Sequence, residues 1–235
     1  MKYIWLMTYN FIFLPLFWLV LRILSPVNKK INEGFRARKN FFKDLPENFA
    51  SFDKSKNNIL IHCSSLGEFE QAKPIIEYLD KLNQFNFIIT FFSSSGYNNS
   101  SFDSQLASKY AIIYLPFDSP DNVKRFIKII NINAAIFVKY DLWLNLLCQL
   151  KSSNIFIMLV NATYREKALK WKFFLTKSYR KVVYNCFNLI ATSDKEDANS
   201  LKRVLSPEIE IIEVGDTKVE RIRKAKIIAQ NVSRG

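Results

Sequence analysis

From Asn57 onward the chain alternates short apolar runs with segments of helical periodicity, and this alternation constrains its fold more than any other feature. The runs are nearly continuous and rich in Ile, Val and Phe, as in parallel strands that helices cover on both faces. The repetition predicts an α/β domain built on a Rossmann-like, doubly wound parallel sheet. The predicted strands are Ile59–Cys63, Phe85–Phe92, Ala111–Leu115, Ala134–Tyr140, Ile155–Val160, Leu189–Thr192 and Ile209–Val214.

The carboxyl ends of these strands are where a ligand site is expected, because doubly wound sheets bind ligands there. The candidate loops are SSLGE, SSSGY, PFDSP, KYDLW and NATYR, which follow the first five predicted strands. None of them has the G-x-G-x-x-G pattern of classical dinucleotide sites, and the chain has no G-x-x-x-x-G-K-[ST] loop. Neither a classical dinucleotide site nor a P-loop is therefore supported.

The amino terminus predicts contact with a membrane. An uncharged run from Ile4 to Leu21 approaches the ~20 residues that cross a bilayer, although polar residues and Pro15 interrupt it. Residues 1–25 are therefore predicted to form an anchor helix that either spans the membrane or lies in its interface. A buried helix of a soluble domain is the alternative.

Positive charge is concentrated beside this anchor. Residues 1–43 carry eight basic residues and one acidic residue, a net +7 out of +13 for the whole chain. Such a block indicates an anionic partner, and the positive-inside rule places the rest of the chain on the cytoplasmic face. Because the charge adjoins an apolar run, a membrane surface is expected as partner and a nucleic acid is not.

Cysteine and histidine usage gives no support to a metal site. Cys63, Cys148 and Cys186 are widely spaced and form no C-x-x-C pair, so they are expected to be reduced packing residues. His62 is the only histidine, which excludes an H-E-x-x-H zinc site. No metal or cofactor is expected, and His62 is interpreted as a strand-end residue rather than a catalytic one.

Glu68 is the first acidic residue after the first predicted strand, and it has two interpretations. Ser65 and Glu68 fit the S-x-x-E capping box, in which the glutamate only stabilises the start of a helix. A carboxylate at the carboxyl edge of the sheet, on a loop of small residues, is also placed to act as a general base toward a bound hydroxyl. The residue types alone leave both roles open.

Five segments, in order behind the apolar run, resemble the amino-terminal domain of the 3-deoxy-D-manno-octulosonic acid (Kdo) transferase family, the lipid A-specific enzymes. They read IHCSSLGEFEQAKPII, ITFFSSSGY, YLPFDSPDNVKRFI, AIFVKYDLWLN and VGDTKVERI. The resemblance implies the first half of a GT-B glycosyltransferase that adds Kdo from CMP-Kdo to the lipid A precursor, lipid IVA, at the bacterial inner membrane. It implies an inverting transfer without a metal, with Glu68 as the catalytic base and the rest of the domain as acceptor site.

The other expected site residues come from the loops that match the family and from the positive charge beside the anchor. The acceptor is expected at the two small-residue loops, and its phosphates beside the basic residues that follow the anchor, for which a solvated positive flank is the alternative. The expected acceptor-binding residues are Ser65, Gly67, Ser93, Ser94, Ser95, Gly96, Arg36, Arg38 and Lys39.

The fourth loop departs from the family pattern. Many members carry E-x-E-L-W-P-N where this chain has KYDLWLN. Lys139 replaces the first acid, so no acidic role is transferred to it. Asp141 keeps the second acid and is expected to support the site, and Trp143 is expected to pack in the core.

These observations predict four segments and two competing functions. The segments are an anchor (1–25), a basic connection (26–56), a Rossmann-like acceptor-binding domain (57–222) and a basic tail toward a donor domain that these residues do not include (223–235). The expected function is that of the acceptor-binding half of a Kdo transferase. The alternative is a non-catalytic, membrane-anchored module that binds lipid or anions.

Overall fold

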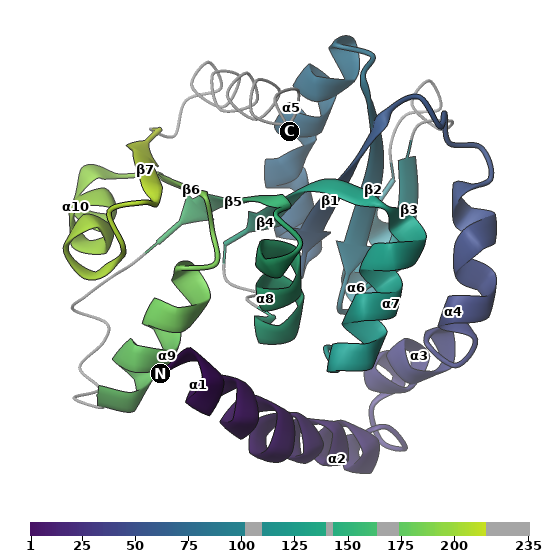
Figure 1. The fold of residues 1–235 in the computed structure, drawn as a ribbon. Helices are drawn as coiled ribbons and strands as arrows, with labels where there is room; N and C mark the ends of the chain where they lie inside the picture. Colours follow the sequence, from purple (N-terminus) through teal and green to yellow (C-terminus); the bar gives the residue numbers. More distant parts are fainter. Residues whose placement is uncertain (102–109, 140–142, 164–173, 215–235) are drawn as a thin grey trace.

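A computed structural model describes residues 1–101, 110–139, 143–163 and 174–214. Its centre is a parallel sheet with strand order β3-β2-β1-β4-β5-β6-β7 (Figure 1), which confirms the predicted α/β fold. All seven predicted strands are present, with ends that differ by a residue or two at most. Their bounds are β1 Asn57–Cys63, β2 Phe85–Phe91, β3 Tyr110–Tyr114, β4 Ile132–Val138, β5 Phe156–Ala162, β6 Leu189–Thr192 and β7 Glu210–Glu213.

Helices cover both faces of the sheet, which explains why the strands are apolar throughout. One face packs against α5 (Leu66–Lys81), whose Phe69, Ala72 and Ile76 are buried. The other face packs against α7 (Pro120–Ile130), α8 (Leu144–Ser152), α9 (Phe174–Tyr184) and α10 (Lys195–Val204). The short helix α6 (Ser94–Asn99) follows β2. The order of the strands reverses between β1 and β4, so the loops that follow these strands flank the expected ligand crevice.

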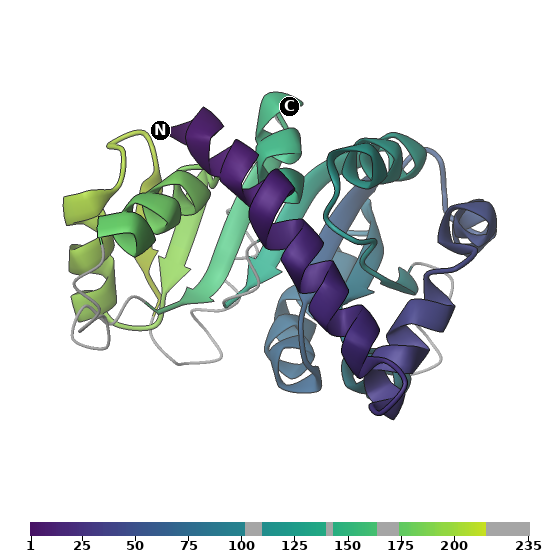
Figure 2. The ribbon, with the colours of Figure 1, turned by 90° about the horizontal axis from the view of Figure 1, so that it is seen from below.

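The predicted anchor forms one helix, Lys2–Leu24, built from α1 (Lys2–Thr8), a π-helical turn η1 (Tyr9–Phe13) and α2 (Leu14–Leu24). The helix is long and apolar enough to cross a membrane. The π-turn immediately precedes Pro15, which has no N–H to give to the preceding turn. Seen from below in Figure 2, the helix runs diagonally across the domain.

Polar side chains attach this helix to the domain at the carboxyl edge of the sheet. Trp5 Nε1 donates to Ser178 Oγ of α9 (2.9 Å), and Tyr9 OH donates to Asp118 Oδ2 (2.8 Å). Asn10 Nδ2 donates to Asn145 Oδ1 in the first turn of α8 (3.0 Å). The polar residues that weaken a membrane-spanning interpretation therefore hold the helix against the folded domain.

The outward face of the helix is apolar and exposed. Only 6% of its most apolar stretch is buried. The exposed fractions of Ile4, Phe11, Leu16 and Ile23 lie between 57% and 75%. We call the outward-facing, exposed apolar residues of Lys2–Leu24 the apolar strip.

The predicted connection, residues 26–56, is folded onto the domain. It contains α3 (Lys29–Ala37), α4 (Phe41–Asp44) and a 3-10 helix η2 (Leu45–Phe49). Leu45 is fully buried in the core, and the ring of Phe41 lies 6.1 Å from that of Phe126 in α7. The predicted tail at 223–235 and the end of the predicted domain beyond residue 214 lie outside the described residues.

We predict that Tyr9→Phe destabilises the protein by about 1–3 kcal/mol, because it removes a donor from the buried carboxylate of Asp118. Tyr3→Phe is the matched control, since Tyr3 lies on the same helix and is 81% exposed. Urea unfolding in detergent measures both changes. Equal stability of the two variants would show that the Tyr9–Asp118 hydrogen bond does not hold the helix.

We also predict that the contribution of Asp118 to stability falls as pH rises from about 4 to 7. Burial raises the pKa of Asp118 to about 7, against the opposing effect of hydrogen bonds from Tyr9, Asn145 and Leu146. The native state therefore binds this proton more tightly than the unfolded chain, in which aspartates titrate near 3.9. Ionisation of Asp118 consequently lowers the unfolding free energy by up to about 4 kcal/mol. The difference in unfolding free energy between the wild type and Asp118→Asn should follow this slope. A difference that is flat or rises over this range would contradict the assignment.

Candidate active site

Glu68 lies in the first turn of α5, directly beyond the carboxyl end of β1. Ser65 caps the helix by accepting a hydrogen bond from the Glu68 N–H (3.4 Å). The Glu68 carboxylate turns back, and its Oε2 accepts from both the N–H and the hydroxyl of Ser64, each at 2.6 Å. The helix-start role is therefore present in the structure.

The same contacts also hold a reactive group in one orientation. Glu68 is 7% exposed, and both Ser64 donors bind Oε2. Among the described residues, none donates to Oε1. One carboxylate oxygen is thus fixed by Ser64, and the other is available to a ligand.

Cys63 lies beside Glu68 at the end of β1, and its thiol does not compete for chemistry. Burial, and then the neighbouring charge of Glu68, raise the pKa of the Cys63 thiol well above its ordinary value. The thiol therefore stays protonated. This agrees with the predicted packing role.

The SSSGY loop after β2 is joined directly to the Glu68 loop. Ser93 Oγ donates to the Ser64 carbonyl (2.9 Å) and accepts from Gly96 N–H (3.4 Å). Ser94 differs, because it is only 2% exposed and its hydroxyl has no hydrogen-bond partner in the described structure. The structure therefore brings the predicted Ser93, Ser94 and Gly96 together with Glu68, and leaves Ser94 as the unpartnered hydroxyl.

Arg38 reaches the same loops from α3. Its Nε donates to the Leu115 carbonyl (2.7 Å), and its Nη2 donates to the Phe92 carbonyl (2.9 Å). Its guanidinium also lies 4.8–5.1 Å from the rings of Phe92, Tyr114 and Phe117. Burial lowers the pKa of Arg38 to about 10, so the group stays protonated at neutral pH. In the described structure its charge is held by backbone carbonyls and aromatic faces, without a carboxylate.

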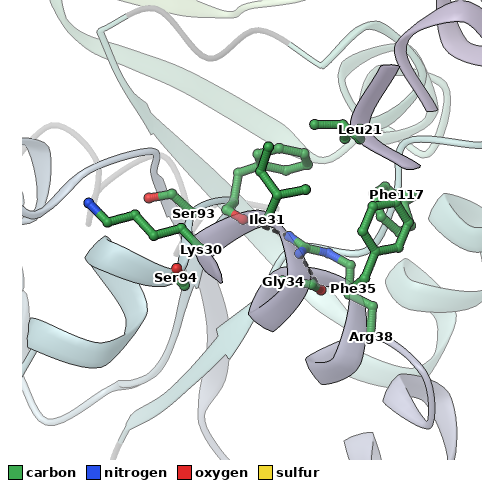
Figure 3. Close-up of a pocket in the computed structure, with 10 residues that line it drawn as sticks. Leu21, Lys30, Ile31, Gly34, Phe35, Arg38, Ser93, Ser94 and Phe117 are labelled. Atoms are coloured by element: carbon green, nitrogen blue, oxygen red, sulfur yellow. Dashed lines mark hydrogen bonds between the residues drawn. The ribbon is translucent and has the colours of Figure 1, made fainter. Parts of the chain in front are cut away.

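A cavity of about 120 Å³ lies beside Arg38. Its surface is largely apolar, and we call it the polar cavity only after Lys30, Arg38, Ser93 and Ser94, which are among its lining residues. Figure 3 shows Lys30, Ser93 and Ser94 together on one side of it. Lys30 is not among the site residues predicted from the sequence. Its spacing from Arg38 could have identified it, because Lys30, Gly34 and Arg38 lie four residues apart and therefore share one helical face. The predicted Arg36 and Lys39 are exposed and do not line this cavity.

His62 is committed to internal hydrogen bonds. It is 1% exposed, and its Nε2 accepts from Trp143 Nε1 (3.1 Å). The proton therefore lies on Nδ1, which contacts Thr90 Oγ1 at 3.0 Å. These contacts give His62 a structural role at the end of β1. Trp143 is half-buried against the core, with its ring 4.6 Å from that of Phe92, and is not enclosed in the core as expected.

The loops after β4 and β5 are described only in part. Lys139 adopts a left-handed conformation (φ 62°), and its N–H donates to the Val160 carbonyl (3.0 Å). Asn161 Nδ2 donates to Gln71 Oε1 on α5 (3.0 Å), which ties the fifth loop to the Glu68 helix. Asp141, the predicted supporting acid, and Gly215 lie outside the described residues.

Comparison with known proteins gives one family match. The family model for 3-deoxy-D-manno-octulosonic-acid transferase (kdotransferase) matches residues 36–221. A bifunctional glycosyltransferase/methyltransferase of Fusobacterium nucleatum is 27% identical over 163 residues, which cover 68% of this chain and 25% of that protein. The 3-deoxy-D-manno-octulosonic acid transferases of Haemophilus influenzae and Aquifex aeolicus are 26% and 27% identical, over 58% and 72% of this chain. These matches cover 31% and 41% of the two transferases, so the chain spans well under half the length of these curated relatives.

Solved structures resemble the chain more distantly. A sucrose-phosphate synthase from Thermosynechococcus elongatus has a TM-score of 0.47 at 10% identity, over 76% of this chain and 98% of that one. A UDP-N-acetylglucosamine 2-epimerase has a TM-score of 0.49 at 15% identity, over 71% of this chain and 50% of that one.

The two loop glycines give a matched pair of predictions. A Cβ at Gly96 would overlap the ring of Phe91, which is fully buried, whereas a Cβ at Gly67 meets nothing within 4 Å. We expect Gly96→Ala to cost about 1–3 kcal/mol through overpacking. Gly67→Ala should change the unfolding free energy by no more than about 0.5 kcal/mol. Urea unfolding tests both, and a strongly destabilised Gly67→Ala would contradict the open space at that position.

Proposed function

This chain belongs to the Kdo transferase family, and from that premise we propose that it is the acceptor-binding half of a glycosyltransferase that transfers Kdo from CMP-Kdo to the lipid A precursor. The reaction requires a base for an acceptor hydroxyl and a separate site for the sugar nucleotide. The residues of this chain supply the first. The second belongs to a donor domain outside these 235 residues, so the activity is proposed for the complete protein.

The observation that carries the proposal is the geometry of Glu68. Its Oε2 is held by Ser64, and Oε1 is available at the carboxyl edge of the sheet. In the proposed inverting transfer, Glu68 takes the proton of a glucosamine hydroxyl, the hydroxyl oxygen attacks the anomeric carbon of Kdo, and CMP leaves with the bonding electrons. A fixed carboxylate suits this role because a general base must lie within hydrogen-bond reach of the proton it removes.

The polar cavity supports a contact between the acceptor and the predicted loops. Ser94 offers a buried hydroxyl without a partner, and Arg38 and Lys30 add positive charge beside it. A phosphate of the acceptor at this point would meet the positive charge of Lys30 and of Arg38, although the Arg38 guanidinium already donates to the carbonyls of Gly34, Phe92 and Leu115. Contacts from Ser65, Ser95, Arg36 and Lys39 stay predictions from the sequence.

The apolar strip supports a membrane-interface location. The inward face of the helix is bonded to the domain, so the exposed apolar face is the part available to lipid. We propose that the helix lies in the interface of the inner membrane, with the domain on the cytoplasmic face and basic residues near the lipid phosphates.

We predict that Glu68→Gln in the complete two-domain enzyme lowers transfer by about 10²-fold or more, because the base is lost. If Glu68 only capped α5, the same change would cost about 1 kcal/mol of stability and leave turnover per folded molecule nearly unchanged. Glu70→Gln is the matched control, since Glu70 lies on the same helix in an exposed ion pair with Lys73 (2.6 Å). Turnover of a well-folded Glu68→Gln enzyme equal to that of Glu70→Gln would rule out the base.

A further inference from the structure

A large groove of about 690 Å³ separates part of the amino-terminal helix from the domain. Leu14, Phe17 and Trp18 line it from the helix, and Phe117 and Trp143 line it from the loops after β3 and β4. We call this space the apolar groove. It is several times larger than the polar cavity, and the function proposed above does not use it.

The lining of the apolar groove selects an apolar ligand. Its polar members are Asn10, Asp118 and Ser119. The Asn10 side chain binds Asn145 of α8, the Asp118 carboxylate accepts from Tyr9 and from the start of α8, and the Ser119 hydroxyl caps α7. The remaining wall is largely aromatic and aliphatic. Water needs two to four polar partners to occupy a site stably, and these groups offer few. A hydrocarbon chain gains from the burial of the same walls.

The position of the apolar groove indicates the source of that chain. On its outer side, Phe11, Trp18 and Leu19 belong both to the lining of the groove and to the exposed helix face, so the groove is continuous with the apolar strip. On its inner side, Phe117 separates the groove from the polar cavity and lines both spaces. An amphiphile could therefore keep a phosphorylated head beside Ser94 and Arg38 while its chain enters between helix and domain.

We propose that the apolar groove binds a fatty-acyl chain of the phosphorylated glycolipid acceptor. This inference rests on the proposed function, because the loop of Glu68 is joined to the polar cavity through the hydrogen bond from Ser93 to Ser64. A chain held in the groove would restrict the position of the sugar headgroup before the donor arrives. The groove would then orient the acceptor as well as add to its affinity.

Trp143 provides a direct test. It lines the groove and keeps its hydrogen bond to His62 inside the domain. The chain has four tryptophans, so Trp5→Phe, Trp18→Phe and Trp171→Phe together leave Trp143 as the only one. The full 235-residue chain is mixed with anionic phosphatidylglycerol vesicles whose acyl chains are brominated mid-chain. Because bromine quenches indole on contact, Trp143 should lose about half of its emission relative to unbrominated vesicles. Unbrominated lipid A precursor should restore the emission.

A second variant supplies the control. Trp5 packs against Tyr179 and Ser178 at the other end of the helix and does not line the groove. A chain with Trp5 as the only tryptophan should show no recovery when the precursor is added. If Trp143 stays quenched at saturating precursor, the groove is occupied by bulk phospholipid. That result would overturn the proposal. Absence of Trp143 quenching, both in these vesicles and in vesicles that contain lipid A precursor brominated in its acyl chains, would also overturn it.

The outcome is separable from that of the proposed function. Quenching and its reversal need no donor sugar, so they can succeed even if the complete enzyme transfers no Kdo. Conversely, if the complete enzyme transfers Kdo but the precursor does not restore Trp143 emission, the proposed reaction stands. Only the acyl-chain site in the apolar groove is then rejected.

Discussion

The carboxylate of Asp118 holds together the part of the molecule on which the candidate site depends. It accepts hydrogen bonds from Tyr9 of the amino-terminal helix and from the backbone N–H groups of Asn145 and Leu146 at the start of α8. These bonds join the helix, the loop after β3 and the loop after β4 at the carboxyl edge of the sheet. Because the helix forms one wall of the apolar groove and Leu21 lines the polar cavity, its attachment decides the shape of both spaces.

Two charged residues of the site each combine a structural contact with a chemical capacity. Glu68 accepts from Ser64 as a helix-start residue does, and the same bonds fix the orientation required of a base. Arg38 donates to the carbonyls that follow β2 and β3, and still brings a protonated group to the edge of the polar cavity. In both cases the structural hydrogen bonds fix the orientation of the charged side chain. They do not prevent the side chain from taking part in chemistry. The two interpretations of Glu68 are therefore compatible.

The amino-terminal helix has two faces with different roles. Its polar residues, which a membrane-spanning helix would bury at a cost, instead meet partners on the domain. Its apolar residues form the apolar strip. The charged segment follows the helix directly in the chain, so it begins at the same surface. The surfaces proposed for membrane contact and acceptor binding, together with the candidate base, are thereby brought to one side of the protein.

Local sequence patterns were sufficient to predict the strands, the covering helices and the candidate loops, because buried parallel strands and amphipathic helices leave a periodic pattern. It also indicated Glu68 through the order of strand, small-residue loop and helix. The sequence did not predict that Tyr9 and Asn10 dock the helix, that Lys30 joins Arg38 beside Ser94, or that Trp143 donates to His62; these contacts are visible only in the folded structure. These contacts connect residues far apart in the chain, and no local pattern encodes which distant groups a folded sheet will bring within hydrogen-bond reach.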